Sequence, residues 1–120
     1  MKDCWRKTMY SYEGNIVNIN GIKLMFKYSV RDMLKYKEKY IILLEIPYDK
    51  DDINNIYCLN ENTKLIWKVE DLDKLYPERR NMPYEQIAVE NNILYASDFA
   101  GRCYHIDIDN GCIIGCNINR

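Results

Sequence analysis

The sequence predicts an all-β fold in a single domain over residues 1–120, with an N-terminal β-hairpin at about 15–28 and two four-stranded antiparallel meanders at about 30–69 and 84–118. Apolar and polar residues alternate along most of the chain, turn-forming residues recur between these segments, and two parts of the chain have similar patterns. The length suits one domain, and a hydrophobic content of 48% is too high for a disordered chain.

The N-terminal hairpin is predicted by Asn20-Gly21, which lies between apolar runs at 15–19 and 22–26. Both residue types tolerate the positive φ of the two-residue turns that join antiparallel strands. An Asn-Gly pair in this setting is therefore a strong hairpin signal.

Each meander is predicted as four extended segments joined by polar turns. The segments lie at 33–36, 40–46, 55–59 and 65–69 in the first meander, and at 84–89, 93–97, 102–108 and 112–118 in the second. Pro47 ends one strand because proline donates no hydrogen bond to a neighbouring strand. Residues 70–83 form a polar loop with two prolines, in which we expect one helical turn at 71–75.

An internal repeat accounts for this order of segments. Tyr40 aligns with Ile93 at an offset of 53 residues and Tyr57 aligns with Tyr104 at an offset of 47, so one loop absorbs the difference. The residues expected in the core include Ile16, Phe26, Ile41, Leu43, Ile56, Trp67, Ile87, Leu94, Ile106 and Ile113.

Residues 56–67 and 94–111 each match part of a longer pattern: an apolar-Tyr pair, small residues, a Gly turn, an aromatic strand, Leu-Asp, a Thr-Gly turn, then apolar residues and a Trp. This pattern resembles the blade repeat of pyrroloquinoline-quinone-type β-propellers. The first segment keeps Trp67, whereas the second keeps Gly111 and has Ile114 at the Trp position. The resemblance implies that the two meanders are propeller-blade-like.

The resemblance also bears on function. A closed propeller has at least four blades, so two blades cannot build the central funnel that holds the quinone, and we expect no cofactor. The chain is also similar to short bacterial proteins with two such blades behind an N-terminal hairpin. Some of these resemble immunity proteins encoded beside secreted antibacterial toxins, which implies an inhibitor of a cognate toxin.

Three cysteines, Cys103, Cys112 and Cys116, lie near the only histidine, His105. A four-residue turn at 108–111 would place Cys103 opposite Cys116 and put all four side chains on one face, where they could bind zinc. However, the odd total of five cysteines and an N-terminus without a secretory signal favour reduced cysteines in a cytoplasmic protein. We therefore expect no metal, and a small Cys/His metal protein or enzyme stays open as an alternative.

Acidic residues concentrate between positions 41 and 78, where nine Asp or Glu residues outnumber four Lys residues. Most lie in two loops, which follow the second and fourth strands of the first meander and so emerge at the same end of the sheet. We expect one anionic surface that meets a cationic partner. The predicted partner-binding residues are Tyr48, Asp49, Asp51, Asp52, Glu70, Asp71, Asp73, Tyr76 and Glu78.

The sequence contains no recognisable nucleophile motif, phosphate-binding loop or concentrated basic face. We therefore predict a non-enzymatic protein that binds neither nucleic acid nor membrane. The leading hypothesis is an immunity protein that covers the basic active site of a toxin domain. The alternatives are a scaffold protein with an unknown partner and, for assembly, a homodimer formed through an open sheet edge.

Overall fold

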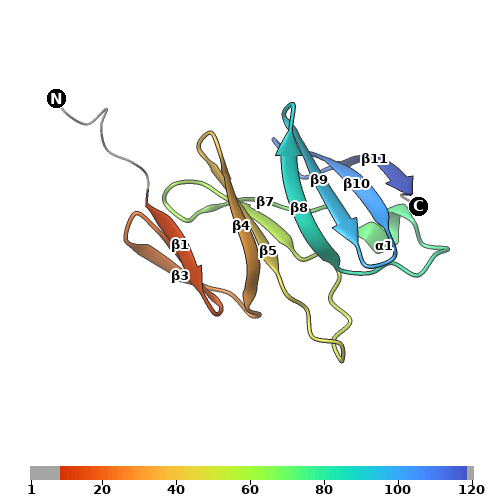
Figure 1. The fold of residues 1–120 in the computed structure, drawn as a ribbon, viewed down its shortest axis with the longest axis horizontal. Helices are drawn as coiled ribbons and strands as arrows, with labels where there is room; N and C mark the ends of the chain where they lie inside the picture. Colours follow the sequence, from red (N-terminus) through yellow and green to blue (C-terminus); the bar gives the residue numbers. More distant parts are fainter. Residues whose placement is uncertain (1–8, 119–120) are drawn as a thin grey trace.

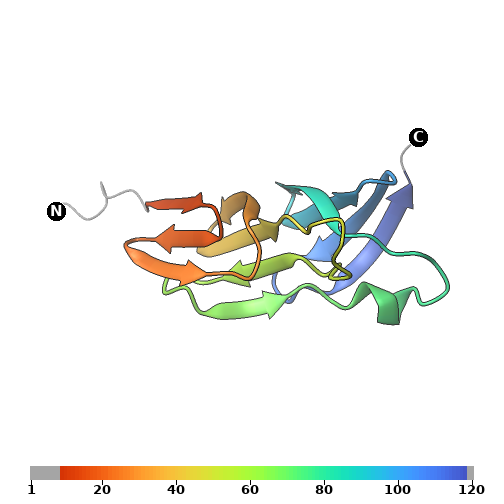
Figure 2. The ribbon, with the colours of Figure 1, turned by 90° about the horizontal axis from the view of Figure 1, so that it is seen from below.

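Three antiparallel sheets, stacked along the longest dimension of 55 Å, make up the computed structural model, which describes residues 9–118 (Figures 1 and 2). The N-terminal sheet contains β1 (Tyr10–Glu13), β2 (Ile16–Ile19) and β3 (Ile22–Met25). The middle sheet contains β4 (Val30–Tyr36), β5 (Lys39–Leu44), β6 (Ile56–Leu59) and β7 (Leu65–Lys68). The C-terminal sheet contains β8 (Tyr84–Glu90), β9 (Ile93–Asp98), β10 (Arg102–Asp107) and β11 (Ile113–Ile118).

The predicted all-β fold is confirmed, and both four-stranded meanders lie where they were expected. The N-terminal unit has one strand more than the predicted hairpin, because β1 pairs with β2 across a turn at Gly14, whose φ is +59°. The helical turn expected in the loop is present as α1 (Leu72–Leu75). No helix within residues 9–118 has the length and apolar character needed to cross a membrane.

The middle sheet is buried on both faces because the other two sheets cover it. Ile42 and Leu44 pack toward the N-terminal sheet, whereas Ile41 and Leu43 pack toward the C-terminal sheet. A strand that is buried on both faces needs apolar residues at consecutive positions, which explains the unbroken apolar run in β5. Seven of the ten predicted core residues are buried, and the three that are only half-buried are Ile16, Phe26 and Ile113.

The middle and C-terminal sheets are built alike. In each, a two-residue turn joins the first two strands and a bulge interrupts the first strand pair near its start. These features align Tyr40 with Leu94, so the offset over the first two strands is 54 residues and the predicted alignment with Ile93 is wrong by one. The offset of 47 that places Tyr57 on Tyr104 agrees with the pairing of the third strands.

The last strands of the two sheets also share a bulge, at Ile66 in β7 and at Ile114 in β11. The turn before β11, residues 107–112, is one residue longer than the turn before β7, residues 60–64, so the offset of the last strands is 48 residues. Trp67 therefore corresponds to Gly115, and its predicted alignment with Ile114 is wrong.

The outer face of the C-terminal sheet is less apolar than the face with which the middle sheet packs on its neighbour. The middle sheet packs on its neighbour with Ile41, Leu43, Ile56, Cys58 and Trp67, and the equivalent residues on the outer face are Tyr95, Ser97, Cys103, His105 and Gly115. On that face His105 meets the ring of Tyr95 with centroids 4.9 Å apart, and its Nε2 lies 3.1 Å from Asn117 Nδ2. This face does not repeat the apolar surface on which another sheet would pack.

Side chains also connect the first strands of successive sheets, which are edge strands. The hydroxyl of Tyr12 in β1 donates to the carbonyl of Arg31 in β4 at 3.2 Å. The Arg31 Nε in turn donates to the carbonyl of Glu85 in β8 at 2.8 Å. These bonds occupy edge carbonyls that would otherwise be free to pair with another chain.

A tryptophan locks the middle sheet onto the last hairpin. Trp67 Nε1 donates to the carbonyl of Ile108 at 2.9 Å, and its ring lies against Gly111. Gly111 has a φ of +80°, and a Cβ at this position would lie only 2.6 Å from Trp67 Cε3. Both the backbone conformation and the contact therefore require glycine.

The Gly111→Ala variant should lower the free energy of unfolding by about 2–4 kcal/mol, because it combines a strained φ with a clash against Trp67. Urea denaturation followed by tryptophan fluorescence measures this change. Gly21→Ala is the matched control, since Gly21 has a φ of +89° but no atom within 4 Å of an added Cβ. Gly21→Ala should lower the free energy of unfolding by about 1 kcal/mol. Equal losses for the two variants would contradict the close packing of Gly111 against Trp67.

Candidate functional site

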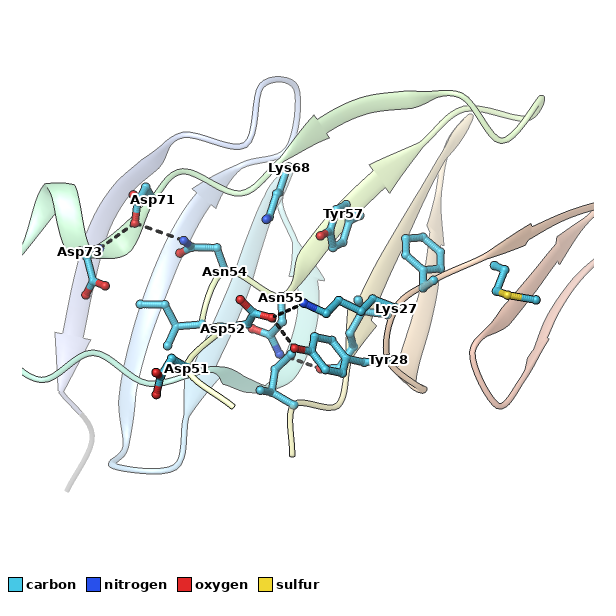
Figure 3. Close-up of a pocket in the computed structure, with 15 residues that line it drawn as sticks. Lys27, Tyr28, Asp51, Asp52, Asn54, Asn55, Tyr57, Lys68, Asp71 and Asp73 are labelled. Atoms are coloured by element: carbon cyan, nitrogen blue, oxygen red, sulfur yellow. Dashed lines mark hydrogen bonds and ion pairs between the residues drawn. The ribbon is translucent and has the colours of Figure 1, made fainter. Parts of the chain in front are cut away.

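A groove of about 490 Å³ lies where the N-terminal sheet, the loop after β5 and the segment before α1 meet (Figure 3). The two loops predicted to share one end of the middle sheet converge here. The groove is lined by four carboxylates, Asp51, Asp52, Asp71 and Asp73, and by two ammonium groups, Lys27 and Lys68. These charges leave a formal excess of negative charge, and we call the feature the acidic groove.

Asn55, whose side chain is buried, fixes the backbone beside the groove. Its Nδ2 donates to the carbonyls of Leu44 at 2.7 Å and Tyr84 at 2.9 Å, and its Oδ1 accepts from the Tyr84 N–H at 2.9 Å. One amide therefore joins the end of β5 to the start of β8. The loop that carries Asp51 and Asp52 must close onto this point.

Asn54 connects the same loop to α1. Its Nδ2 donates to Asp71 Oδ1 at 3.2 Å, and its Oδ1 accepts from the Leu72 N–H at 3.0 Å. Asp71 is also the N-cap of the helix, because its Oδ1 accepts from the Asp73 N–H at 3.1 Å. These bonds hold the carboxylates of the second acidic loop at the groove (Figure 3).

Tyr28 and Lys27 reach across the groove to Asp52. The Tyr28 hydroxyl donates to Asp52 Oδ2, and Lys27 Nζ lies 3.5 Å from the same oxygen (Figure 3). The hydrogen bond from Tyr28, aided by the charge of Lys27, lowers the pKa of the Asp52 carboxyl. The same hydrogen bond raises the pKa of Tyr28.

The groove also has an aromatic wall. The rings of Phe26 and Tyr57 lie 5.3 Å apart, and Lys68 Nζ lies 5.3 Å from the centre of the Tyr57 ring. Carboxylates beside an aromatic face favour a cationic group, which gains from both the charges and the ring quadrupole.

The structure places the nine predicted partner-binding residues in three settings. Four line the acidic groove: Asp51, Asp52, Asp71 and Asp73. Three are exposed outside its lining: Tyr48, Asp49 and Glu78. The remaining two, Glu70 and Tyr76, contact the C-terminal sheet.

Glu70 and Tyr76 have structural contacts of their own. Glu70 Oε1 accepts a hydrogen bond from the Ile113 N–H at 2.8 Å and so occupies a donor at the bulge of β11. The ring of Tyr76 lies 6.1 Å from that of Tyr104, and the guanidinium of Arg79 lies 3.7 Å from the centre of the Tyr76 ring. Neither residue faces the acidic groove.

The prediction that Cys103 lies opposite Cys116 on the paired strand is wrong. The bulge at Ile114 shifts the strand register, so that Cys116 pairs with Tyr104 and Cys103 pairs with Asn117. Cys103 and His105 therefore lie on the outer face, whereas Cys116 packs against the core.

The four cysteine side chains of residues 9–118 accordingly do not gather at one place. Cys112 is exposed near the last turn. Within residues 9–118, no group of three or more His, Cys, Asp or Glu side chains is arranged to hold a metal ion.

Sequence analysis missed the basic and aromatic side chains of the groove. Phe26, Lys27 and Tyr28 belong to the short connection between β3 and β4. That connection joins the N-terminal sheet to the middle sheet and therefore passes the loop after β5. Tyr57 and Lys68 come from β6 and β7, whose outward faces were not assigned to a site.

The sequence matches the family described as Domain of unknown function (DUF7957) over residues 7–117. The chain belongs to this family. A comparison with curated proteins found no match.

Among solved structures, two computationally designed proteins have a similar fold, each with a TM-score of 0.58 and 12% sequence identity. The match covers 92% of this chain and 36% of the designed Ika8 protein, so this DUF7957 chain spans about a third of that protein's length. It covers 96% of this chain and 76% of the designed Ika4 protein. At this identity the likeness concerns the fold alone.

The Asn55→Ala variant should lower the free energy of unfolding by about 2–4 kcal/mol, because it leaves buried backbone groups of Leu44 and Tyr84 without partners. Urea denaturation measures the change. Asn62→Ala is the matched control, since Asn62 lies exposed in the turn between β6 and β7, and its effect should stay within about 0.5 kcal/mol. Similar values for both variants would show that the Asn55 amide does not join the strands.

The Tyr28→Phe variant should raise the pKa of Asp52 toward its ordinary value, because the hydrogen bond that favours the carboxylate is removed. Carboxyl-detected NMR titration measures this pKa, and Tyr48→Phe is the control because Tyr48 is fully exposed. The pKa of Asp52 is lower in the folded chain than in the unfolded chain, so its contact stabilises the fold above about pH 4 and is lost as the pH falls through the folded value. An unchanged pKa in Tyr28→Phe would rule out the hydrogen bond in solution.

Proposed function

We propose that this DUF7957 chain is a non-enzymatic protein-binding module that acts as an immunity protein, using the acidic groove to bind a cognate antibacterial toxin. The observation that carries the proposal is the convergence of Asp51 and Asp52 from one loop with Asp71 and Asp73 from another. Residues that are far apart in the sequence thereby form a single negatively charged surface.

The carboxylates are held in place before any partner arrives. Asp52 is bound by Tyr28 and Lys27, and Asp71 is bound by Asn54. Groups that are already ordered lose little conformational entropy on binding, which favours affinity. Complementary charge also steers a basic partner and raises the association rate.

The immunity hypothesis follows from the chemistry of such a surface. A nuclease toxin needs a basic active site to hold phosphate, and an inhibitor with fixed carboxylates occupies that site in place of phosphate. The resemblance to two-blade bacterial immunity proteins supports the same proposal, with propeller-blade-like sheets as the scaffold and the cytoplasm as the location.

The test uses the product of the gene adjacent to the one that encodes this chain. Its affinity for the full chain is measured by calorimetry, and its toxic activity is measured with and without the chain. The Asp51→Lys/Asp73→Lys variant should weaken binding by about 100-fold, because it places like charges against the basic partner.

The matched control is Glu61→Lys/Glu90→Lys, which makes the same change in net charge. Both control residues are exposed and lie at the other end of the strands, Glu61 in the turn between β6 and β7 and Glu90 as the last residue of β8. The control should change the affinity by less than about threefold at physiological salt. Equal effects of the two variants would refute the groove as the binding surface, and a bound partner that keeps full activity would instead indicate a scaffold.

A further inference from the structure

The place occupied by the acidic groove recurs between the middle and C-terminal sheets. The shared strand pairing makes Tyr57 of β6 equivalent to Tyr104 of β10, and Lys68 of β7 equivalent to Cys116 of β11. Tyr57 and Lys68 line the groove. Tyr104 and Cys116 mark the corresponding position one sheet further along the stack.

In the second position the space is filled by the chain itself. The Arg79 guanidinium lies 3.7 Å from the centre of the Tyr76 ring and 5.8 Å from that of Tyr104. Its Nη2 lies 4.0 Å from Cys116 Sγ. The loop between α1 and β8 thus inserts an arginine, with an aromatic ring against it, beside the two equivalent residues.

In the first position the equivalent space is open. Within residues 9–118 no arginine lines the groove, the ring of Phe26 lies 5.3 Å from that of Tyr57, and the groove has a volume of about 490 Å³. The ring of Tyr57 has a cation beside it, the Lys68 ammonium at 5.3 Å, but that lysine comes from the groove's own wall. The open position therefore has the same aromatic platform as the filled one, with four carboxylates added.

We propose that the acidic groove binds an arginine side chain of the partner, with its guanidinium stacked on Tyr57 and paired with the groove carboxylates. This inference rests on the proposed function and names the chemistry of the partner's contact. The position beside Tyr104, where Arg79 of the same chain lies, is the intramolecular counterpart of this arginine contact.

Arginine suits the groove better than lysine does. Its planar guanidinium stacks on an aromatic ring and forms two parallel hydrogen bonds with a carboxylate, whereas an ammonium acts as a compact point charge. The stacked cation gains from the ring of Tyr57, and the carboxylates of Asp51 and Asp73 supply opposite charge.

The experiment titrates the full chain with a capped peptide, Tyr-Pro-Glu-Arg-Arg, which copies the chain's own residues 76–80. Amide NMR shifts of Asn54, Asn55 and the strands beside them report occupancy of the groove. We expect saturable shifts with a dissociation constant on the order of 1 mM, as is usual for a short flexible ligand. The peptide in which lysine replaces both arginines should bind about fivefold more weakly. The peptide in which neutral citrulline replaces both arginines should give no saturable shifts.

Two variants test the assigned platform. Tyr57→Leu should weaken peptide binding about fivefold because the stacking surface is lost, while Lys68→Met should strengthen it because the competing cation is removed. Tyr95→Leu, which alters an aromatic residue on the outer face, should change nothing, and thermal unfolding confirms that all three variants fold. Equal binding of the arginine and citrulline peptides, or unchanged binding in Tyr57→Leu, would overturn the inference.

Failure of this inference is distinct from failure of the proposed function. If Tyr57→Leu leaves the affinity for the toxin unchanged while Asp51→Lys/Asp73→Lys weakens it, the arginine contact is refuted and the protein-binding role stands. If neither variant changes that affinity, both are refuted.

Discussion

The buried amide of Asn55 is the interaction on which the arrangement of this molecule depends. It satisfies a carbonyl at the end of β5 and both backbone groups of Tyr84 at the start of β8, so it sets where the C-terminal sheet begins relative to the middle sheet. A fully satisfied polar group inside an apolar stack specifies one geometry, whereas apolar contacts alone tolerate sliding. The position of the loop after β5, and with it half of the acidic groove, follows from this amide.

The three sheets stack because the middle sheet has apolar side chains on both faces, and each neighbouring sheet buries one of these faces. Trp67 adds a directional element, because its indole N–H bonds to the turn of the last hairpin and its ring requires glycine at position 111. The acidic groove and the position beside Tyr104 are equivalent places between successive sheets. The loop that carries Arg79 fills the second, whereas the first stays open.

The fold was largely predictable because its signals are local. Asn20-Gly21, the alternating strands and the recurrent turns identify the hairpins. The strand registers were not predictable, because no residue type in the sequence marks the bulge at Ile114. One extra residue in a strand moves every side chain beyond it to the opposite face of the sheet. That single residue separates Cys116 from Cys103. The acidic side of the groove was predictable from loop positions, but its aromatic side was not, since Tyr57 and Phe26 meet only through the stacking of two sheets.

The exchange of large apolar residues for Tyr95, Ser97, Cys103 and Gly115 on the outer face has a consequence for assembly. If that face matched the apolar face of the middle sheet, it could accept the first sheet of another copy, and each added copy would offer the same end again. Such a head-to-tail contact does not close on itself and leads to fibres of indefinite length. Because Ser97, Cys103 and Gly115 stand where the middle sheet has Leu43, Ile56 and Trp67, the outer face does not offer that surface, and substitutions toward Leu, Ile and Trp there would create it.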